Sequence, residues 1–130
     1  MPAASKIKAV VVDDQLTMRA LVRTGLNQMG ITDVREYPGA QEALTNLRTQ
    51  SAHLVLSDFN MPEMDGLGFL RAVRADAQLK NTAFILLTGR ADNDLVQRAN
   101  QFGANNYLVK PFTVAALKEK LEQVFGPITA

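Results

Sequence analysis

Four apolar runs in this sequence end directly in residues that could bind a cation and accept a phosphoryl group. These residues are Asp13-Asp14, Ser57-Asp58, Thr88 and Lys110-Pro111. Clustered carboxylates repel one another, so three of them at one site require a nearby cation or raised pKa values. Lys110 supplies one positive charge and leaves a deficit that a divalent cation would fill. An all-oxygen site suits Mg²⁺.

A carboxylate beside Mg²⁺ and a lysine can act as a nucleophile toward a phosphoryl group. The metal and the ammonium offset the charge on the transferred group, and a threonine hydroxyl can hydrogen-bond one of its oxygens. These residue types therefore predict phosphoryl transfer to a carboxylate.

Each of these residues also has an ordinary structural explanation when it is taken alone. Asp13 or Asp14 could cap a helix, and Asp58 could be a turn residue. Thr88 could stand near the start of the next helix, and Lys110 could be a solvated surface lysine. Their joint position at the ends of four runs favours a shared site. The single histidine, His53, precedes a run rather than following one, and we interpret it as structural.

The elements that would position these residues alternate along the chain. Apolar runs predict strands at 7–12, 32–36, 54–58, 83–87 and 107–109, the second being more polar and suited to a sheet edge. Between and after them, apolar residues at helical spacing predict helices within 18–29, 40–47, 67–74, 95–102 and 117–125. Five βα units predict an α/β fold, a parallel sheet with helices on both faces. In such sheets ligands bind outside the carboxyl ends of the strands, which is where the polar residues fall.

Composition limits the class of protein. The chain has 130 residues, 47% of them apolar, which fits one domain over 1–130 with a core of roughly 6–126. The net charge of +1 gives no general attraction to nucleic acid or anionic membrane. The absence of cysteine excludes disulfides and fits a reducing cytoplasm. No run approaches the roughly 20 apolar residues of a membrane helix, and we expect no membrane insertion.

Four motifs resemble those of response regulator receiver domains. They are VVVDDQLTMR, SDFNMPEMDG, LLTG and YLVKPF, which begin at Val10, Ser57, Leu86 and Tyr107. The resemblance covers essentially the whole chain and is strongest to single-domain chemotaxis regulators of the CheY type. It implies a doubly wound, flavodoxin-like sheet of strand order 2-1-3-4-5, which is a known property of that family.

The resemblance also implies the roles of the metal-site residues. Asp58 would be the phospho-acceptor. Asp14 would bind Mg²⁺ together with Asp58 and the backbone carbonyl of Asn60. Asp13 would act through a metal-bound water or a hydrogen bond.

A second set of roles concerns switching. Thr88 would bind the phosphoryl group and shift toward it, and Tyr107 would turn inward as Thr88 moves. Lys110 would pair with the phosphoryl oxygens, and its bond to Pro111 would be cis.

Two positions vary within the family pattern. Gly89 stands where alanine is common, which would loosen the moving loop. Arg90 replaces an acidic residue and, with Asn60, borders the entrance used by attacking water. We expect Arg90 to alter the lifetime of the phosphoryl group, which the dephosphorylation rate of Arg90→Glu would test.

The resemblance further implies partners. A histidine kinase would donate the phosphoryl group, binding near the first helix and the loops around Asp58. The face formed by the fourth helix, fifth strand and fifth helix would bind a protein target, with a flagellar motor switch as the first candidate. Because no segment remains for a DNA-binding module, we expect protein output, no nucleic-acid partner, a monomer, and no enzymatic activity beyond the protein's own phosphorylation and dephosphorylation.

Other functions fit the sequence less well. A haloacid-dehalogenase-like phosphatase needs a second aspartate two residues after its nucleophile, but Gln15 stands two residues after Asp13. A flavodoxin-type module would need a phosphate-binding loop where Asp13 and Asp14 would repel a flavin phosphate, and no G-x-G-x-x-G pattern is present. A phosphate sink, or a pseudo-receiver that acts without phosphorylation, stays open.

Overall fold

Strands and helices alternate along the chain, as the sequence predicts. The computed structural model describes residues 3–61, 63–89 and 93–128. The strands are β1 (Lys8–Val12), β2 (Asp33–Tyr37), β3 (Leu54–Asp58), β4 (Ala83–Thr88) and β5 (Asn106–Val109). The helices are the 3-10 turn η1 (Ala4–Lys6), α1 (Leu16–Gln28), α2 (Ala40–Thr49), α3 (Gly66–Ala75), α4 (Asn93–Gln101) and α5 (Val114–Phe125).

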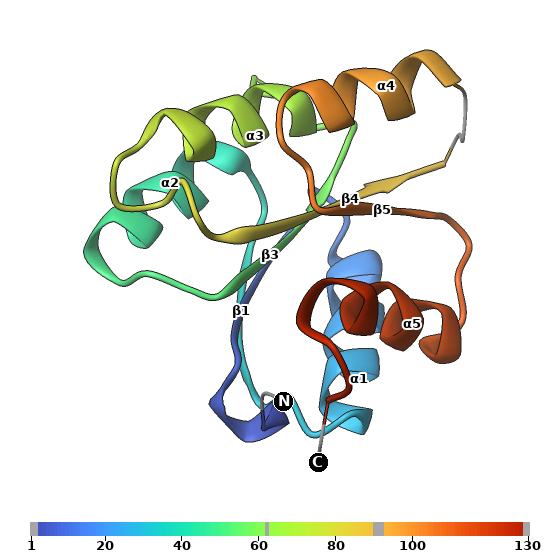
Figure 1. Cartoon of the computed structure of the whole chain (residues 1–130). Helices are drawn as coiled ribbons and strands as arrows, with labels where there is room; N and C mark the ends of the chain where they lie inside the picture. Colours follow the sequence, from blue (N-terminus) through green and yellow to red (C-terminus); the bar gives the residue numbers. More distant parts are fainter. Residues whose placement is uncertain (1–2, 62, 90–92, 129–130) are drawn as a thin grey trace.

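The described strands form one parallel sheet in the order β2-β1-β3-β4-β5. This confirms the doubly wound α/β fold and its strand order. The more polar strand β2 lies at an edge, as its composition predicts. Figure 1 shows α1 and α5 on one side of the sheet and α2, α3 and α4 on the other.

The core has two parts because the central strands are buried on both faces. Alternate residues of β1 point to opposite sides: Val11 packs with Leu26 of α1 and Leu117 of α5, whereas Val10 packs with Leu47 of α2 and Phe69 of α3. Side chains on a strand alternate between the two faces of a sheet, so an unbroken apolar run supplies both cores.

Two segments near the chain ends also enter the core. Ala4 is fully buried and Ile128 is 8% exposed, and both belong to the core on the α1–α5 side. They lie just outside the expected range of 6–126. The backbone N–H of Ile128 donates to Glu122 Oε2 over 3.1 Å, which holds the segment after α5 against the domain.

The helix ends follow local signals. Gly30, φ 92°, and Gly103, φ 95°, take the left-handed backbone conformation that ends α1 and α4. Thr113 caps α5 by accepting a hydrogen bond from the backbone N–H of Ala116 over 3.0 Å. None of the described helices is long and apolar enough to cross a bilayer.

Candidate functional site

The carboxyl ends of four strands bring the predicted site residues to one rim of the sheet. Asp13 directly follows β1, Asp58 is the last residue of β3, Thr88 ends β4, and Lys110 directly follows β5. Strands β1 and β3 are neighbours, with Val12 in register with Ser57. This pairing places the acidic residues of the two strands side by side, at the point where the strand order reverses.

Three carboxylates meet at this rim. Oxygen atoms of Asp13, Asp14 and Asp58 all lie within 4.8 Å of one another. Asp13 is fully buried and Asp58 is 7% exposed, whereas Asp14 is exposed to solvent. Such a set fits a small hard cation, because every donor is an oxygen and one edge of the cluster stays open to water ligands.

Lys110 is the cation that the site itself provides. Its Nζ donates to Asp58 Oδ1 over 2.7 Å and to Asp13 Oδ2 over 3.2 Å. Burial lowers the pKa of Lys110, but the hydrogen bond to Asp58 and the charges of both carboxylates outweigh it, so the pKa is raised above its ordinary value. The Lys110 ammonium therefore stays charged at neutral pH. The peptide bond between Lys110 and Pro111 is cis, as the resemblance implies.

Asp13 is fixed by contacts from several elements. Its backbone N–H donates to the carbonyl of Tyr37 over 3.2 Å, and its Oδ1 accepts from the backbone N–H of Gln15 over 2.9 Å. Burial raises the pKa of the Asp13 carboxyl, and the neighbouring Asp58 charge adds to this, although the Gln15 N–H and Lys110 act in the opposite direction. Without a further cation, Asp13 is a costly charge to hold at this position.

The loop between β3 and α3 positions Asp58. Phe59 N–H donates to the carbonyl of Leu87 over 2.8 Å, and Gly66 N–H donates to the carbonyl of Phe59 over 2.8 Å. Asp65 caps α3 by accepting from the backbone N–H of Gly68 over 2.8 Å. A Cβ on Gly66 would lie 2.6 Å from the backbone oxygen of Asp58, so only glycine allows this approach.

A small cavity adjoins the rim beside Thr88. It has a volume of about 290 Å³ and is lined by Phe59, Asn60, Thr88, Gly89, Asp94, Leu95 and Arg98. Thr88 is 3% exposed, and its carbonyl accepts from the backbone N–H of Lys110 over 2.7 Å. Asn60 and Gly89 therefore border the same space as Thr88, whereas Arg90 lies outside the described residues.

Tyr107 lies on β5, apart from the carboxylates. It is partly buried and packs against the core on the α2–α3–α4 side. The Nζ of Lys120, on α5, lies 4.8 Å from the centre of the Tyr107 ring, within cation–π distance. The ring thus connects β5 with α5 on the face expected to bind a target.

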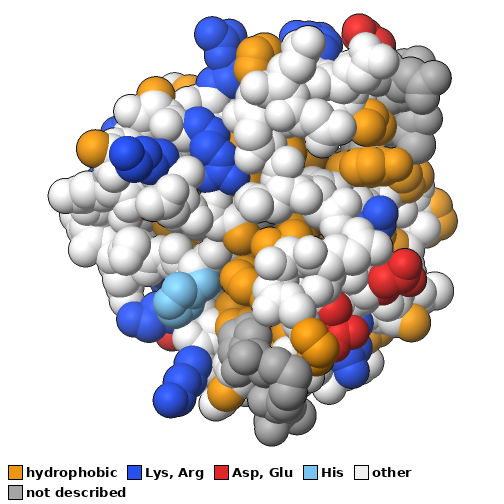
Figure 2. All heavy atoms as spheres, viewed as in Figure 1, with side chains coloured by type: hydrophobic (Ala, Val, Ile, Leu, Met, Phe, Trp, Pro, Cys, Tyr) orange, Lys and Arg blue, Asp and Glu red, His pale blue; other side chains and the backbone are white. Residues whose placement is uncertain are grey.

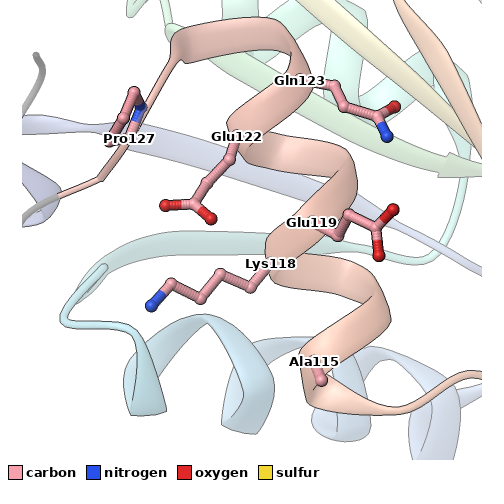
Figure 3. Close-up of a pocket in the computed structure, with 6 residues that line it drawn as sticks. All are labelled: Ala115, Lys118, Glu119, Glu122, Gln123 and Pro127. Carbon is pink, nitrogen blue, oxygen red and sulfur yellow. The ribbon is translucent and has the colours of Figure 1, made fainter.

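Elsewhere in the described part of the chain, no second group of three or more acidic, histidine or cysteine side chains comes together as at the rim. Lys, Arg, Asp and Glu side chains are dispersed over the face shown in Figure 2. Figure 3 shows a shallow depression along the outer side of α5, lined by Ala115, Lys118, Glu119, Glu122, Gln123 and Pro127. His53 is exposed before β3, and its Nδ1 accepts from the backbone N–H of Lys8 over 3.0 Å, in keeping with a structural role.

Three residues near the rim were not singled out from the sequence as part of a site. Asp65 is the first of these, and an aspartate directly before Gly66-Leu67 is a typical helix-cap signal that could have identified it. Gly66 and Arg19 stand inside the quoted motifs, but their contacts join parts of the fold that the sequence pattern does not bring together. Arg19 Nη1 donates to the backbone carbonyl of Asp13 over 2.6 Å.

The fold and this rim define a class of protein, and comparison with known proteins agrees with it. The model of the response regulator receiver domain matches residues 9–122, so the chain belongs to the response regulator receiver family. Its function is that of a response regulator in a two-component system.

Individual relatives are similar along almost the whole chain. The chain is 48% identical over 128 residues to a probable chemotaxis protein CheY of Rhizobium etli, covering 98% of this chain and 99% of that protein. It is 40% identical over 119 residues to the chemotaxis protein CheY of Pseudomonas aeruginosa, covering 92% and 96%. The solved structure of the Vibrio cholerae chemotaxis protein CheY4 superimposes with a TM-score of 0.85 at 32% identity, covering 95% of this chain and 99% of that one.

Proposed function

We propose that Asp58 accepts a phosphoryl group from a histidine kinase and that this modification switches a protein-binding face. The observation that carries the proposal is the position of Asp58, which is the last residue of β3. Its carboxylate accepts a hydrogen bond from Lys110 over 2.7 Å and lies beside Asp13 and Asp14. A nucleophilic carboxylate needs this setting, because charge must be offset as an anionic group approaches another anion.

The donor set fits Mg²⁺. Three carboxylates meet at the rim, and Lys110 contacts two of them, Asp13 and Asp58. One ammonium leaves the rim with a formal negative charge that a divalent cation would offset. Asp14, Asp58 and the backbone carbonyl of Asn60 would hold the ion, with Asp13 acting through a water molecule or a hydrogen bond. When bound, Mg²⁺ supplies positive charge to the oxygens of the transferred group.

The transfer itself uses the side chains of this chain. A carboxylate oxygen of Asp58 attacks the phosphorus of the phosphohistidine, the P–N bond breaks, and an acyl phosphate forms on Asp58. Lys110 leaves its hydrogen bond with the Asp58 carboxylate and donates to a phosphoryl oxygen. Thr88, at the end of the neighbouring strand, donates its hydroxyl to another. The protein catalyses only this acceptance and the later hydrolysis.

Switching follows from the new charge. Movement of Thr88 toward the phosphoryl group would open space into which Tyr107 turns, changing the face made by α4, β5 and α5. Moving a two-state equilibrium from about 1:99 to 99:1 requires roughly 5.5 kcal/mol of differential stabilisation. Charge-assisted hydrogen bonds are each worth about 1.5 to 3 kcal/mol, so about two to four of them would supply this difference.

The target is a protein, and the names of the relatives favour chemotaxis. We propose that this chain is a single receiver domain of the cytoplasm, active as a monomer. Its α4–β5–α5 face would bind a flagellar motor switch. Gly89 and Arg90 would tune the lifetime of the phosphoryl group from positions beside the entrance.

Intact-mass measurement after incubation with Mg²⁺ and a small phosphodonor tests the proposal. We expect one added phosphoryl group, which is lost in Asp58→Asn and lost when the metal is chelated. Asp33→Asn, a change at an exposed residue at the start of β2, serves as the control and should still be modified. No added mass in the parent under any condition would overturn the proposal and leave a binding module that works without phosphorylation.

A further inference from the structure

Arg19 reaches from α1 to the backbone of the acidic rim. Its side chain is 14% exposed, and its Nη1 donates to the carbonyl oxygen of Asp13 over 2.6 Å. A hydrogen bond from a charged donor at this distance is stronger than one between neutral groups. The contact joins the first turns of α1 to the end of β1.

Glu36 holds the guanidinium from the other side. Its Oε1 lies 3.6 Å from Arg19 Nε, and its Oε2 accepts from Arg23 Nη1 over 2.6 Å. Glu36 stands on β2 in register with Val11, so β2 orients the arginine that contacts the end of β1. Arg19 Nε is buried and has no hydrogen-bond partner among the described residues, and the 3.6 Å approach of Glu36 is electrostatic.

The carbonyl that Arg19 binds belongs to the peptide group between Asp13 and Asp14. The rotation of this peptide group determines where the Asp14 side chain leaves the backbone. The Asp13 carboxylate is fixed separately, by the N–H of Gln15 and by Lys110. Among these contacts, the Arg19 hydrogen bond is therefore the one that acts directly on the backbone leading into Asp14.

We propose that Arg19 is a positioning residue that orients the Asp13–Asp14 peptide and thereby sets the affinity of the rim for Mg²⁺. The inference rests on the proposed function, in which Asp14 is a metal ligand. Residues that support metal ligands commonly change metal affinity by about 10- to 100-fold when they are replaced.

The sign of the effect separates positioning from simple charge. As a cation near the rim, Arg19 repels Mg²⁺, so removing its charge would strengthen metal binding by Coulomb's law. As a positioning residue, it strengthens metal binding, so its removal weakens it. Arg23 provides a matched control because it binds the same Glu36, is 42% exposed, and has no described contact with Asp13.

Titration with Mg²⁺, followed through the backbone amide resonances of residues 13–15, measures the dissociation constant without any phosphorylation. We expect Arg19→Gln to raise the Kd about tenfold. Arg19→Lys, which keeps the charge but cannot reproduce the planar fork, should raise it by a smaller factor. Arg23→Gln should stay within about twofold of the parent, as expected for an exposed ion pair.

A second measurement distinguishes positioning from general damage to the fold. The phosphorylation rate of the Arg19 variants should be low at limiting Mg²⁺ and return to near the parent value at saturating Mg²⁺, because Asp58 and Lys110 are unchanged. Tighter or unchanged Mg²⁺ binding in Arg19→Gln overturns the inference. If that variant does not fold, an unchanged Kd in Arg19→Lys overturns it. If the parent itself binds no Mg²⁺, the proposed function fails as well.

Discussion

Replacement of Gly66 by alanine tests whether the loop after β3 is shaped by contact with Asp58. Gly66 is the first residue of α3, where an alanine would ordinarily favour the helix by reducing the freedom of the unfolded chain. The structure predicts the opposite sign. The added Cβ would lie 2.6 Å from the Asp58 carbonyl oxygen, 2.7 Å from Leu86 Cδ1 and 2.9 Å from Phe59 Cα.

The magnitude follows from what must move. Two of these three atoms belong to the backbone, so rotation of a flexible side chain cannot relieve the contact. Overpacking of this kind costs about 1 to 3 kcal/mol. With an unfolding entropy of about 2.1 cal/mol/K per residue, Gly66→Ala in this 130-residue chain should lower the Tm by roughly 4 to 11 °C. Because Asp58 must shift, the phosphorylation rate should fall as well.

Thermal unfolding followed by circular dichroism, with a chelator present, measures the stability effect without metal binding. Gly89→Ala is the control, since a Cβ on Gly89 would meet nothing within 4 Å. The free energy of unfolding of this control should change by no more than about 0.5 kcal/mol. A Tm of Gly66→Ala at or above that of the parent would refute the argument that close backbone approach requires glycine at this position.

Two further predictions concern the charges at the rim. Mg²⁺ at a concentration 100 times its Kd should stabilise the protein by about 2.7 kcal/mol, seen as a higher Tm; an equal rise with NaCl of the same ionic strength would contradict specific binding. Asp13→Asn should stabilise the metal-free protein at neutral pH. Burial raises the pKa of Asp13 in the folded state, so the parent loses stability as the pH rises from the ordinary aspartate pKa through this raised pKa. Denaturant unfolding across pH, with a chelator present, should show that the free energy of unfolding of Asp13→Asn exceeds that of the parent by an amount that grows with pH and then levels off. A difference that stays constant at all pH values would contradict the assignment to Asp13.

Strands and helices could be predicted from the sequence because each depends on a local pattern. The runs around Val10 and Val55 are apolar on both faces, which is typical of buried parallel strands, and they form β1 and β3. Gly30 and Gly103 mark helix ends through a backbone conformation that glycine adopts readily. The short strand β5 begins at Asn106, one residue before the start that the sequence predicts. A polar residue does not extend an apolar run, yet Asn106 pairs with Ile85.

The site could be predicted only in outline. Polar residues after apolar runs predict that Asp13, Asp58 and Lys110 lie at one rim. In the structure, Lys110 Nζ lies within hydrogen-bond distance of both carboxylates. The contacts of Arg19 and Gly66 could not be predicted, because each joins a side chain or a missing side chain to backbone from another element. Burial of Ile128 likewise depends on how the end of the chain folds back.

The sharing of Lys110 gives the rim a physical basis for switching. Asp13 is fully buried and Asp58 nearly so, yet one ammonium serves both, at 3.2 and 2.7 Å. Neither carboxylate can gain a stronger interaction with Lys110 without weakening that of the other. Under the proposed function, a phosphoryl group on Asp58 draws the ammonium toward itself, and Asp13 then depends on its other contacts and on the metal. Phosphorylation at the end of β3 thereby affects β1 and β5 through the side chain of Lys110. The backbone N–H of Lys110 also donates to the carbonyl of Thr88, which connects this residue to β4.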